Sequence, residues 1–248
     1  MKLSKIILTS LLLLAVNAAH SSVQVMATRI IFDEKDKEQI IRVNNMGTSP
    51  SWTRVWLESD SSHNLDKINT VNLEDLPFVV YPPESMINAG KGKSFRIYDT
   101  DDTSKNYARD RETVLWVNIL DVPPLDDENE NRNILSMAFK TKIKLFYRPD
   151  GLKSDPISAA EQVVWSAKKV GNKIKIVGNN NNPYHVSMAK LSLVHGSERV
   201  ELVGDMIKPF SSREFVFDSF PMTKNFKLAY TYISDLGGFV TKEIDLEI

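Results

Sequence analysis

The feature that most constrains this fold is a period-two alternation of apolar and polar residues that recurs along nearly the whole chain. In an extended strand this pattern places the apolar side chains on one face and the polar side chains on the other. In the first half, the alternating runs are VQVMATRIIF (23–32), QIIRV (39–43), WTRVWLE (52–58), SFRIYD (94–99) and TVLWVNILD (113–121). Turn-forming clusters separate them, and no alternation of strands with helices is visible. We therefore predict an all-β chain built from antiparallel sandwiches.

One run is unusually long and has two different faces. Residues 134–149 read ILSMAFKTKIKLFYRP. At roughly 3.3 Å per residue, such a strand could extend about 40 Å, whereas a typical strand has about five or six residues. Apart from Thr141, its odd-numbered side is apolar and comprises Leu135, Met137, Phe139, Ile143, Leu145 and Tyr147. Its even-numbered side carries Lys140, Lys142 and Lys144, so one face alone is basic.

The best boundary within the chain is RPDGLKSDP, residues 148–156, where a Pro-Asp-Gly turn is followed by a second proline. Alternating runs resume after it, for example KIKIVGN (173–179) and KLAYTYISD (227–235). A chain of 248 residues is long enough for two domains of ordinary size. We therefore predict two β-sandwich domains, one at residues 22–148 and the other at residues 149–248.

The first residues have the pattern of a secretory signal peptide. Two lysines precede an apolar run at residues 6–16, and small residues follow it. Cleavage after Ala18 and cleavage after Ser21 both fit this pattern, and we assign residues 1–21 to the signal. No later run is long enough to span a bilayer, so we expect a soluble exported protein without membrane insertion. The formal net charge of −1 disfavours binding to nucleic acid or to anionic membranes.

Residues that carry catalysis or metal binding are sparse. The chain has no cysteine, which excludes disulfides and cysteine zinc sites. The four histidines, His20, His63, His185 and His195, have no ligand spacing, and we expect loop or surface residues. The acidic run PLDDENEN (124–131) lacks the spacing and the closing glutamate of a calcium loop, so we predict a solvated loop. No motif for nucleotides or nucleophilic catalysis occurs. We therefore expect no catalytic residue, no metal and no cofactor.

Five spaced motifs cover nearly the whole chain after the signal. They are TRIIFD (28–33), DLPFVVYPPESMINAGKGKSFRI (75–97), DRETVLWVNILDVPP (110–124), IKLFYRP (143–149) and YISDLGG (232–238). In order and spacing they resemble the PapD-like family, the periplasmic chaperones of the chaperone–usher pilus pathway. The resemblance implies two immunoglobulin-like β-sandwiches set at an angle with a cleft between them. It also implies a non-enzymatic periplasmic protein that binds pilus subunits and delivers them to an outer-membrane usher.

The resemblance further implies a role for the long strand. In this family a pilus subunit lacks the last strand of its own sandwich, and the chaperone lends it one, which is donor-strand complementation. By position and by parity, the donor side chains are Leu135, Met137 and Phe139. Arg29 and Lys144 match the pair that holds the carboxylate at the subunit's C-terminus.

Other charged residues divide into two groups. Glu112, Arg148 and Asp235 match an ionic network that holds the angle between the two domains in the family. Lys140 and Lys142 match no family site, and we interpret them as charges that protect an exposed strand edge from misassociation. The absence of cysteine favours the class with a short loop before the donor strand, whereas DVPPLDDENENRN is long for that class, so the subtype stays open.

The residues alone leave other functions open. The principal alternative is a secreted two-domain β-sandwich that acts as a surface or adhesive protein, and a secreted hydrolase on the same scaffold is a third. Neither of these would require a donor strand. An exposed apolar strand also predicts self-association of the free protein through that strand.

Overall fold

The computed structural model describes residues 23–59, 76–100, 107–123, 137–218 and 225–248. The regular secondary structure in these ranges consists of β-strands, in agreement with the period-two alternation. Several predicted features lie outside the described residues, namely the signal peptide, the acidic run 124–131, His20, His63 and Leu135.

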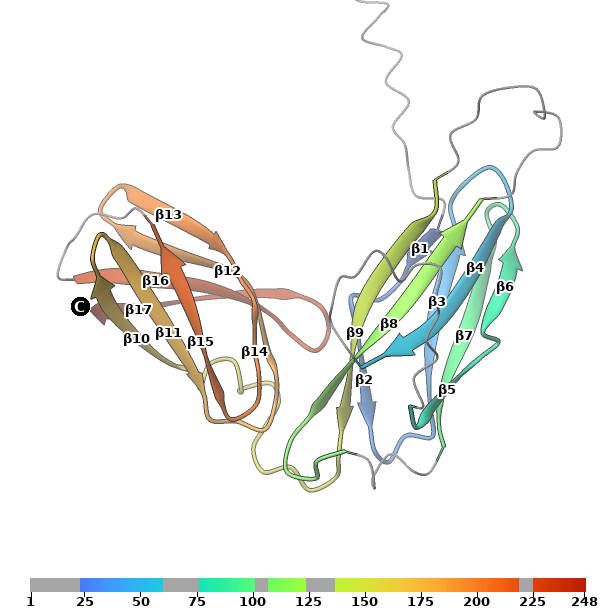
Figure 1. Cartoon of the computed structure of the whole chain (residues 1–248), viewed down its shortest axis with the longest axis horizontal. Coiled ribbons are helices and arrows are strands. Elements are labelled where there is room, and N and C mark those ends of the chain that lie inside the picture. Colours follow the sequence, from blue (N-terminus) through green and yellow to red (C-terminus); the bar gives the residue numbers. More distant parts are fainter. Residues whose placement is uncertain (1–22, 60–75, 101–106, 124–136, 219–224) are drawn as a thin grey trace, which may run out of the picture.

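The first sandwich has two sheets, with the strand orders β1-β3-β7-β5 and β2-β9-β8-β4-β6 (Figure 1). Its strands are β1 (Val23–Val25), β2 (Arg29–Asp33), β3 (Glu38–Asn45), β4 (Ser51–Glu58), β5 (Phe78–Tyr81), β6 (Glu84–Ile87), β7 (Gly92–Asp99), β8 (Thr113–Val122) and β9 (Phe139–Arg148). All pairings are antiparallel except that between β2 and β9.

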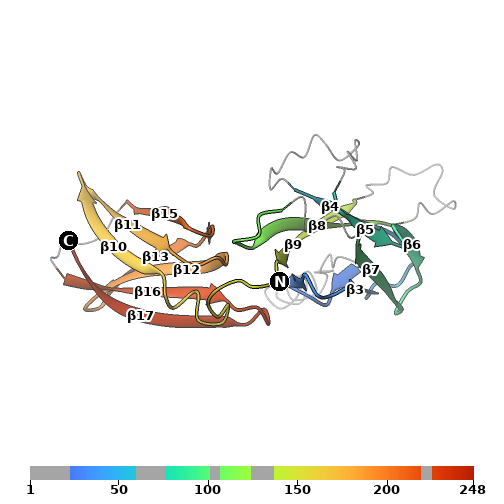
Figure 2. The same cartoon turned by 90° about the horizontal axis from the view of Figure 1, so that it is seen from below.

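The second sandwich pairs a three-stranded sheet, β10-β11-β15, with a larger sheet ordered β13-β12-β16-β17, in which β14 also pairs with β12. Its strands are β10 (Val164–Val170), β11 (Lys173–Asn180), β12 (Val186–His195), β13 (Glu198–Val203), β14 (Met206–Ile207), β15 (Ser211–Phe217), β16 (Asn225–Ile233) and β17 (Phe239–Glu247). Figures 1 and 2 show the two sandwiches as separate lobes, with the turn between β16 and β17 reaching towards the first lobe.

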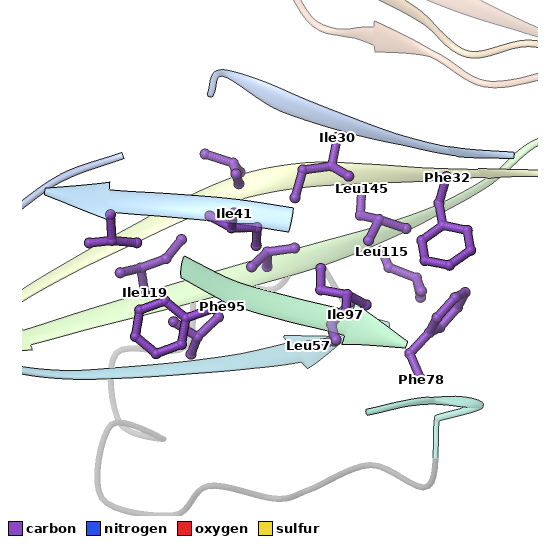
Figure 3. Close-up of a cluster of buried hydrophobic side chains, with 14 of the residues drawn as sticks. Ile30, Phe32, Ile41, Leu57, Phe78, Phe95, Ile97, Leu115, Ile119 and Leu145 are labelled. Carbon is purple, nitrogen blue, oxygen red and sulfur yellow. The ribbon is translucent and has the colours of Figure 1, made fainter. Parts of the chain in front are cut away.

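Each sandwich encloses its own apolar core. The core of the first sandwich lies between its two sheets (Figure 3). It includes Ile30, Phe32, Ile41, Leu57, Phe78, Phe95, Ile97, Leu115, Ile119 and Leu145. The second core includes Trp165, Ile176, Leu191 and Phe215. Because the chain has no cysteine, these two cores supply the stability that disulfides give to many small exported domains.

Strand β9 is shorter at its beginning than the sequence predicts. The alternation suggested a strand over residues 134–149, but the strand starts at Phe139, and Met137 and Ala138 are described outside it. Pairing with β8 extends only to Asp121 opposite Phe139. One residue after β8 comes Pro123, which has no backbone N–H for a further ladder bond. The apolar periodicity therefore continues beyond the paired part of the strand.

Candidate functional site

Strand β9 has one edge that is only half occupied. On one side, β8 pairs with it from Phe139 to Tyr147. On the other side, β2 pairs with it only from Lys144 onwards, where Arg29 is the first partner. Among the described residues, the edge from Phe139 to Ile143 thus has no neighbouring strand. An open edge of this kind can accept a strand from another chain.

The apolar face of β9 passes out of the core along this open edge. Ile143, Leu145 and Tyr147 are buried in the first core. Phe139, four residues before Ile143 and on the same face, is 39% exposed, and Met137 before the strand is 48% exposed. The odd-numbered face of β9 therefore lies in the core towards the end of the strand and forms an exposed apolar surface at its beginning.

Arg29 and Lys144 are direct neighbours, because they are the first register partners of the parallel β2–β9 pair. The Arg29 Nη1 group donates a hydrogen bond to the carbonyl oxygen of Ile233 at 3.1 Å, and its guanidinium carbon lies 5.6 Å from the centre of the Phe146 ring. The Lys144 Nζ atom lies 5.6 Å from the centre of the Trp116 ring. The two cations consequently lie side by side at the point where the open edge ends.

No carboxylate of the described chain forms an ion pair with Arg29 or Lys144, although Asp235 and Glu112 act on the Arg29 charge from a longer distance. The Arg29 Nε atom is buried without a hydrogen-bond partner. Burial lowers the pKa of Lys144, and the neighbouring Arg29 charge lowers it further. Burial likewise lowers the pKa of Arg29. Such a pair favours binding of an anion. An anion would accept hydrogen bonds from the two side chains and offset the repulsion between their positive charges.

Lys140 and Lys142 differ from Lys144 because both have a carboxylate partner. Their Nζ atoms lie 3.6 and 3.0 Å from the two carboxylate oxygens of Glu58. Lys140 also lies over the ring of Trp56 at 4.9 Å. Of the three lysines on this face of β9, only Lys144 has no carboxylate partner among the described residues.

The structure brings Glu112, Arg148 and Asp235 together in one network between the domains. The Arg148 Nε atom donates to Glu112 Oε2 at 2.8 Å, while Nη1 and Nη2 donate to the two oxygens of Asp235 at 2.7 and 2.9 Å. Burial lowers the pKa of Arg148, but hydrogen bonds and charges from Asp235 and Glu112 outweigh burial and raise the pKa above its ordinary value. This bidentate geometry fixes the relative position of the β16–β17 turn and the end of β9.

His185 lies in the loop before β12, which agrees with the sequence interpretation of a loop or surface histidine. Its side chain is nevertheless only 5% exposed. Its Nδ1 atom lies 2.8 Å from Glu112 Oε1, and its backbone N–H donates to the same oxygen at 2.9 Å. The backbone N–H of Glu112 in turn donates to the Pro183 carbonyl oxygen. No local signal relates residues so far apart in the sequence, so only the fold reveals this contact.

A glycine in the β16–β17 turn lets the second domain approach the first closely. Gly237 has a φ of +81°, and a Cβ at this position would collide with the hydroxyl of Thr28. Gly171, in another turn, has a φ of +60° but open space around it.

This difference gives a prediction. Gly237→Ala and Gly171→Ala should both pay the cost of the left-handed conformation, about 1–2 kcal/mol. Gly237→Ala should lower the free energy of unfolding by about 1 kcal/mol more than Gly171→Ala, because Thr28 or the turn must move. Urea unfolding followed by fluorescence measures both values. Equal losses would show that the Thr28 contact does not constrain the turn.

A cavity of about 390 Å³ lies beside the network, and residues of both domains line it, including Arg29, Glu112, Arg148, His185 and Asp235. The described residues hold no cluster of three or more histidine, aspartate or glutamate side chains suited to a metal ion. They also include no helix with the length and apolar character needed to cross a bilayer.

Comparison with known families accounts for almost the entire described chain. The family model "Pili and flagellar-assembly chaperone, PapD N-terminal domain" matches residues 22–153, and "Pili assembly chaperone PapD, C-terminal domain" matches residues 158–244. This chain belongs to the PapD-like family of pilus-assembly chaperones. The resemblance seen in the sequence motifs is thereby confirmed. So is the fold of two immunoglobulin-like β-sandwiches, which is the architecture of this family.

Individual PapD-like relatives match over most of this chain and most of their own length. "Probable fimbrial chaperone YadV" of Escherichia coli strain K12 is 32% identical over 227 residues, covering 90% of this chain and 89% of that protein. "Chaperone protein FimB/FhaD" of Bordetella pertussis is 29% identical over 223 residues, covering 89% and 86%. The crystal structure of the YadV chaperone has a TM-score of 0.75 at 30% identity, covering 91% of this chain and all of that one. The CupB2 chaperone of Pseudomonas aeruginosa has a TM-score of 0.67 at 27% identity, covering 89% and 98%.

Proposed function

We propose that this protein is a non-enzymatic periplasmic chaperone that binds and folds fimbrial subunits by donor-strand complementation and delivers them to an outer-membrane usher. Membership of the PapD-like family supports this function. The observation that carries it is the open edge of β9, along which a buried apolar face becomes an exposed one. A sandwich that lacks a strand exposes an apolar groove and unpaired backbone groups. The open edge of β9 offers apolar side chains for the groove and backbone groups for the missing hydrogen bonds.

The side chains proposed to enter the subunit groove are Leu135, Met137 and Phe139. Met137 and Phe139 lie on the face that Ile143 and Leu145 continue into the core. Full burial of such side chains is worth about 1.5–3 kcal/mol each before the cost of ordering is subtracted. The main-chain ladder supplies hydrogen bonds that any subunit strand can make, so the apolar side chains set the register.

The end of the open edge explains why a subunit's C-terminus should meet Arg29 and Lys144. Strand β2 runs parallel to β9 and occupies the edge from Lys144 onwards. A guest strand on the same edge and in the same direction must stop where β2 begins. Its terminal carboxylate then lies beside the two cations. Arg29 uses Nη1 for the Ile233 carbonyl and its Nε atom is buried without a hydrogen-bond partner, so the guanidinium would turn towards the open edge to bind a carboxylate through two donors.

Glu112, Arg148 and Asp235 are proposed to hold the two domains at the angle that this site requires. The hydrogen bonds between Arg148 and both carboxylates support this role, since buried ion pairs orient elements more than they stabilise a fold. We also retain residues 22–148 and 149–248 as the two domains. The end of β9 at Arg148 and the start of β10 at Val164 support that division.

The donor face can be tested by removing its apolar groups. Met137→Ser with Phe139→Ser should reduce the yield of co-purified subunit from a periplasmic extract more than tenfold, because two buried side chains contribute about 3 kcal/mol or more together. Val170→Ser with Val203→Ser is a matched control, since these exposed valines lie in the second domain. The protein that co-purifies with the unchanged chain at stoichiometric yield should be a small β-rich subunit. Wild-type yield from the donor-face variant would contradict the proposal.

A further inference from the structure

The cavity between the domains has an apolar wall that the carboxylate anchor does not use. Its volume is about 390 Å³. Phe146 contributes to this wall from the first domain, and Ile157, Ala160, Val186, Leu236 and Val240 contribute from the second. A volume near 390 Å³ lies in the lower part of the range of ligand pockets and is ample for one large side chain.

Two apolar residues of the wall are strongly exposed. Leu236 is 99% exposed and Ile157 is 77% exposed. Both line the cavity, and Leu236 directly follows Asp235 of the ionic network. Exposed apolar side chains around a concave surface are typical of a binding site, because a bound apolar group would remove them from water.

Arg29 connects this wall with the anion site. It lines the cavity and also stands beside Lys144 at the end of the open edge. In a peptide with a free C-terminus, the carboxylate and the last side chain are attached to the same Cα atom. A carboxylate bound to Arg29 therefore places the last side chain within reach of the cavity.

We propose that this cavity binds the side chain of the subunit's last residue and selects a large, uncharged apolar side chain. The inference rests on the proposed function, since it assumes that the subunit carboxylate binds Arg29 and Lys144. The charges of the site explain the selection. An acidic last residue would lose water without gaining a free cation, because Arg148 is already bonded to Glu112 and Asp235 and Arg29 would hold the terminal carboxylate. A basic one would meet Arg29 and would lose water without gaining a free carboxylate, because Glu112 and Asp235 are already bonded to Arg148.

Synthetic hexapeptides test this selection with the full-length mature protein. The probes are acetyl-Thr-Val-Thr-Val-Thr-Xaa with Xaa as Leu, Gly or Glu, together with the Leu peptide ending in a carboxamide. Titration at up to millimolar peptide, followed by NMR, should show the Leu peptide binding about tenfold or more tightly than the Gly peptide, because a side chain is buried. The Glu peptide should bind no better than the Gly peptide.

Variants of the chaperone assign the effect to the cavity. Ile157→Glu with Leu236→Glu should abolish the preference for Leu over Gly. Phe239→Glu is the matched control, since Phe239 is 71% exposed in the same region but does not line the cavity. It should leave the preference unchanged.

The outcomes separate this inference from the proposed function. Equal affinities for the Leu and Gly peptides, or no binding of either peptide, would overturn the side-chain selection. If the Leu and Gly peptides bound equally and the Leu acid still bound more tightly than the Leu carboxamide, the carboxylate anchor would stand without the selection. Equal affinities for the Leu acid and the Leu carboxamide would instead contradict the anchor, and the selection would fall with it.

Discussion

Replacing Arg29 and Lys144 together by alanine is expected to abolish subunit capture while leaving the free protein folded. The two side chains offer charge-assisted hydrogen bonds to a carboxylate, worth about 1.5–3 kcal/mol each. Their joint loss should weaken binding at least about a hundredfold. In the free protein neither residue has an ion-pair partner among the described residues. Burial lowers the pKa of both, and the Arg29 charge lowers the pKa of Lys144 further. Thermal unfolding of the double variant should therefore stay close to that of the unchanged chain, since relief of the two buried charges offsets loss of the Arg29 contacts with the Ile233 carbonyl and the Phe146 ring.

The matched control for this experiment lies on the same face of β9 as Lys144. Lys140→Ala with Lys142→Ala also removes two positive charges, but these lysines are neutralised by Glu58. Co-purification of the subunit from periplasmic extracts should be nearly unchanged in this control. Similar losses in both double variants would mean that general charge attraction, and not a carboxylate anchor, holds the subunit. Wild-type yield with the Arg29 and Lys144 variant would contradict the anchor outright.

Arg148→Met is expected to lower the free energy of unfolding by about 3 kcal/mol, because it leaves the buried carboxylate of Glu112 without its cation. The Arg148 side chain is 12% exposed and that of Glu112 is 1% exposed, so water cannot replace the lost partner fully. Urea unfolding followed by tryptophan fluorescence measures the change. Combining Arg148→Met with Glu112→Met should recover part of the loss, since the unpaired charge is then removed as well.

An exposed arginine provides the comparison for this effect. Arg199 pairs with Glu201 at 3.0 Å, but both side chains are nearly half exposed. Arg199→Met should therefore change stability by less than about 1 kcal/mol. If Arg148→Met cost no more than Arg199→Met, the network would not be a structural connection between the domains.

Much of the candidate site could be predicted from residues 134–149 alone. The alternation correctly separated the face that contains Leu145 from the face that contains Lys144. Pattern alone treated Lys140, Lys142 and Lys144 as equivalent, and the family motifs singled out Lys144. The structure supplies a physical difference between them, because Glu58 of β4 lies within reach of the first two. Periodicity describes one strand and contains no information about the strand opposite.

The interdomain contacts were only partly predictable. The motifs named Glu112, Arg148 and Asp235, and these three residues do meet. His185 was missed because its partner Glu112 lies 73 positions away and neither residue has a distinctive neighbour in the sequence. The cavity was missed for the same reason, since its wall combines Phe146 with residues of the second domain.

The sequence by itself determined that the chain forms strands, which face of each strand is apolar, and to which family the chain belongs. These properties depend on neighbouring residues, because alternation along an extended chain decides which side chains share a face. The tertiary structure alone decided where the edge of β9 is open, which cations have no carboxylate partner, and how the domains enclose a cavity. These properties depend on contacts between residues far apart in the chain, and such contacts exist only after the strands have paired and the domains have packed together.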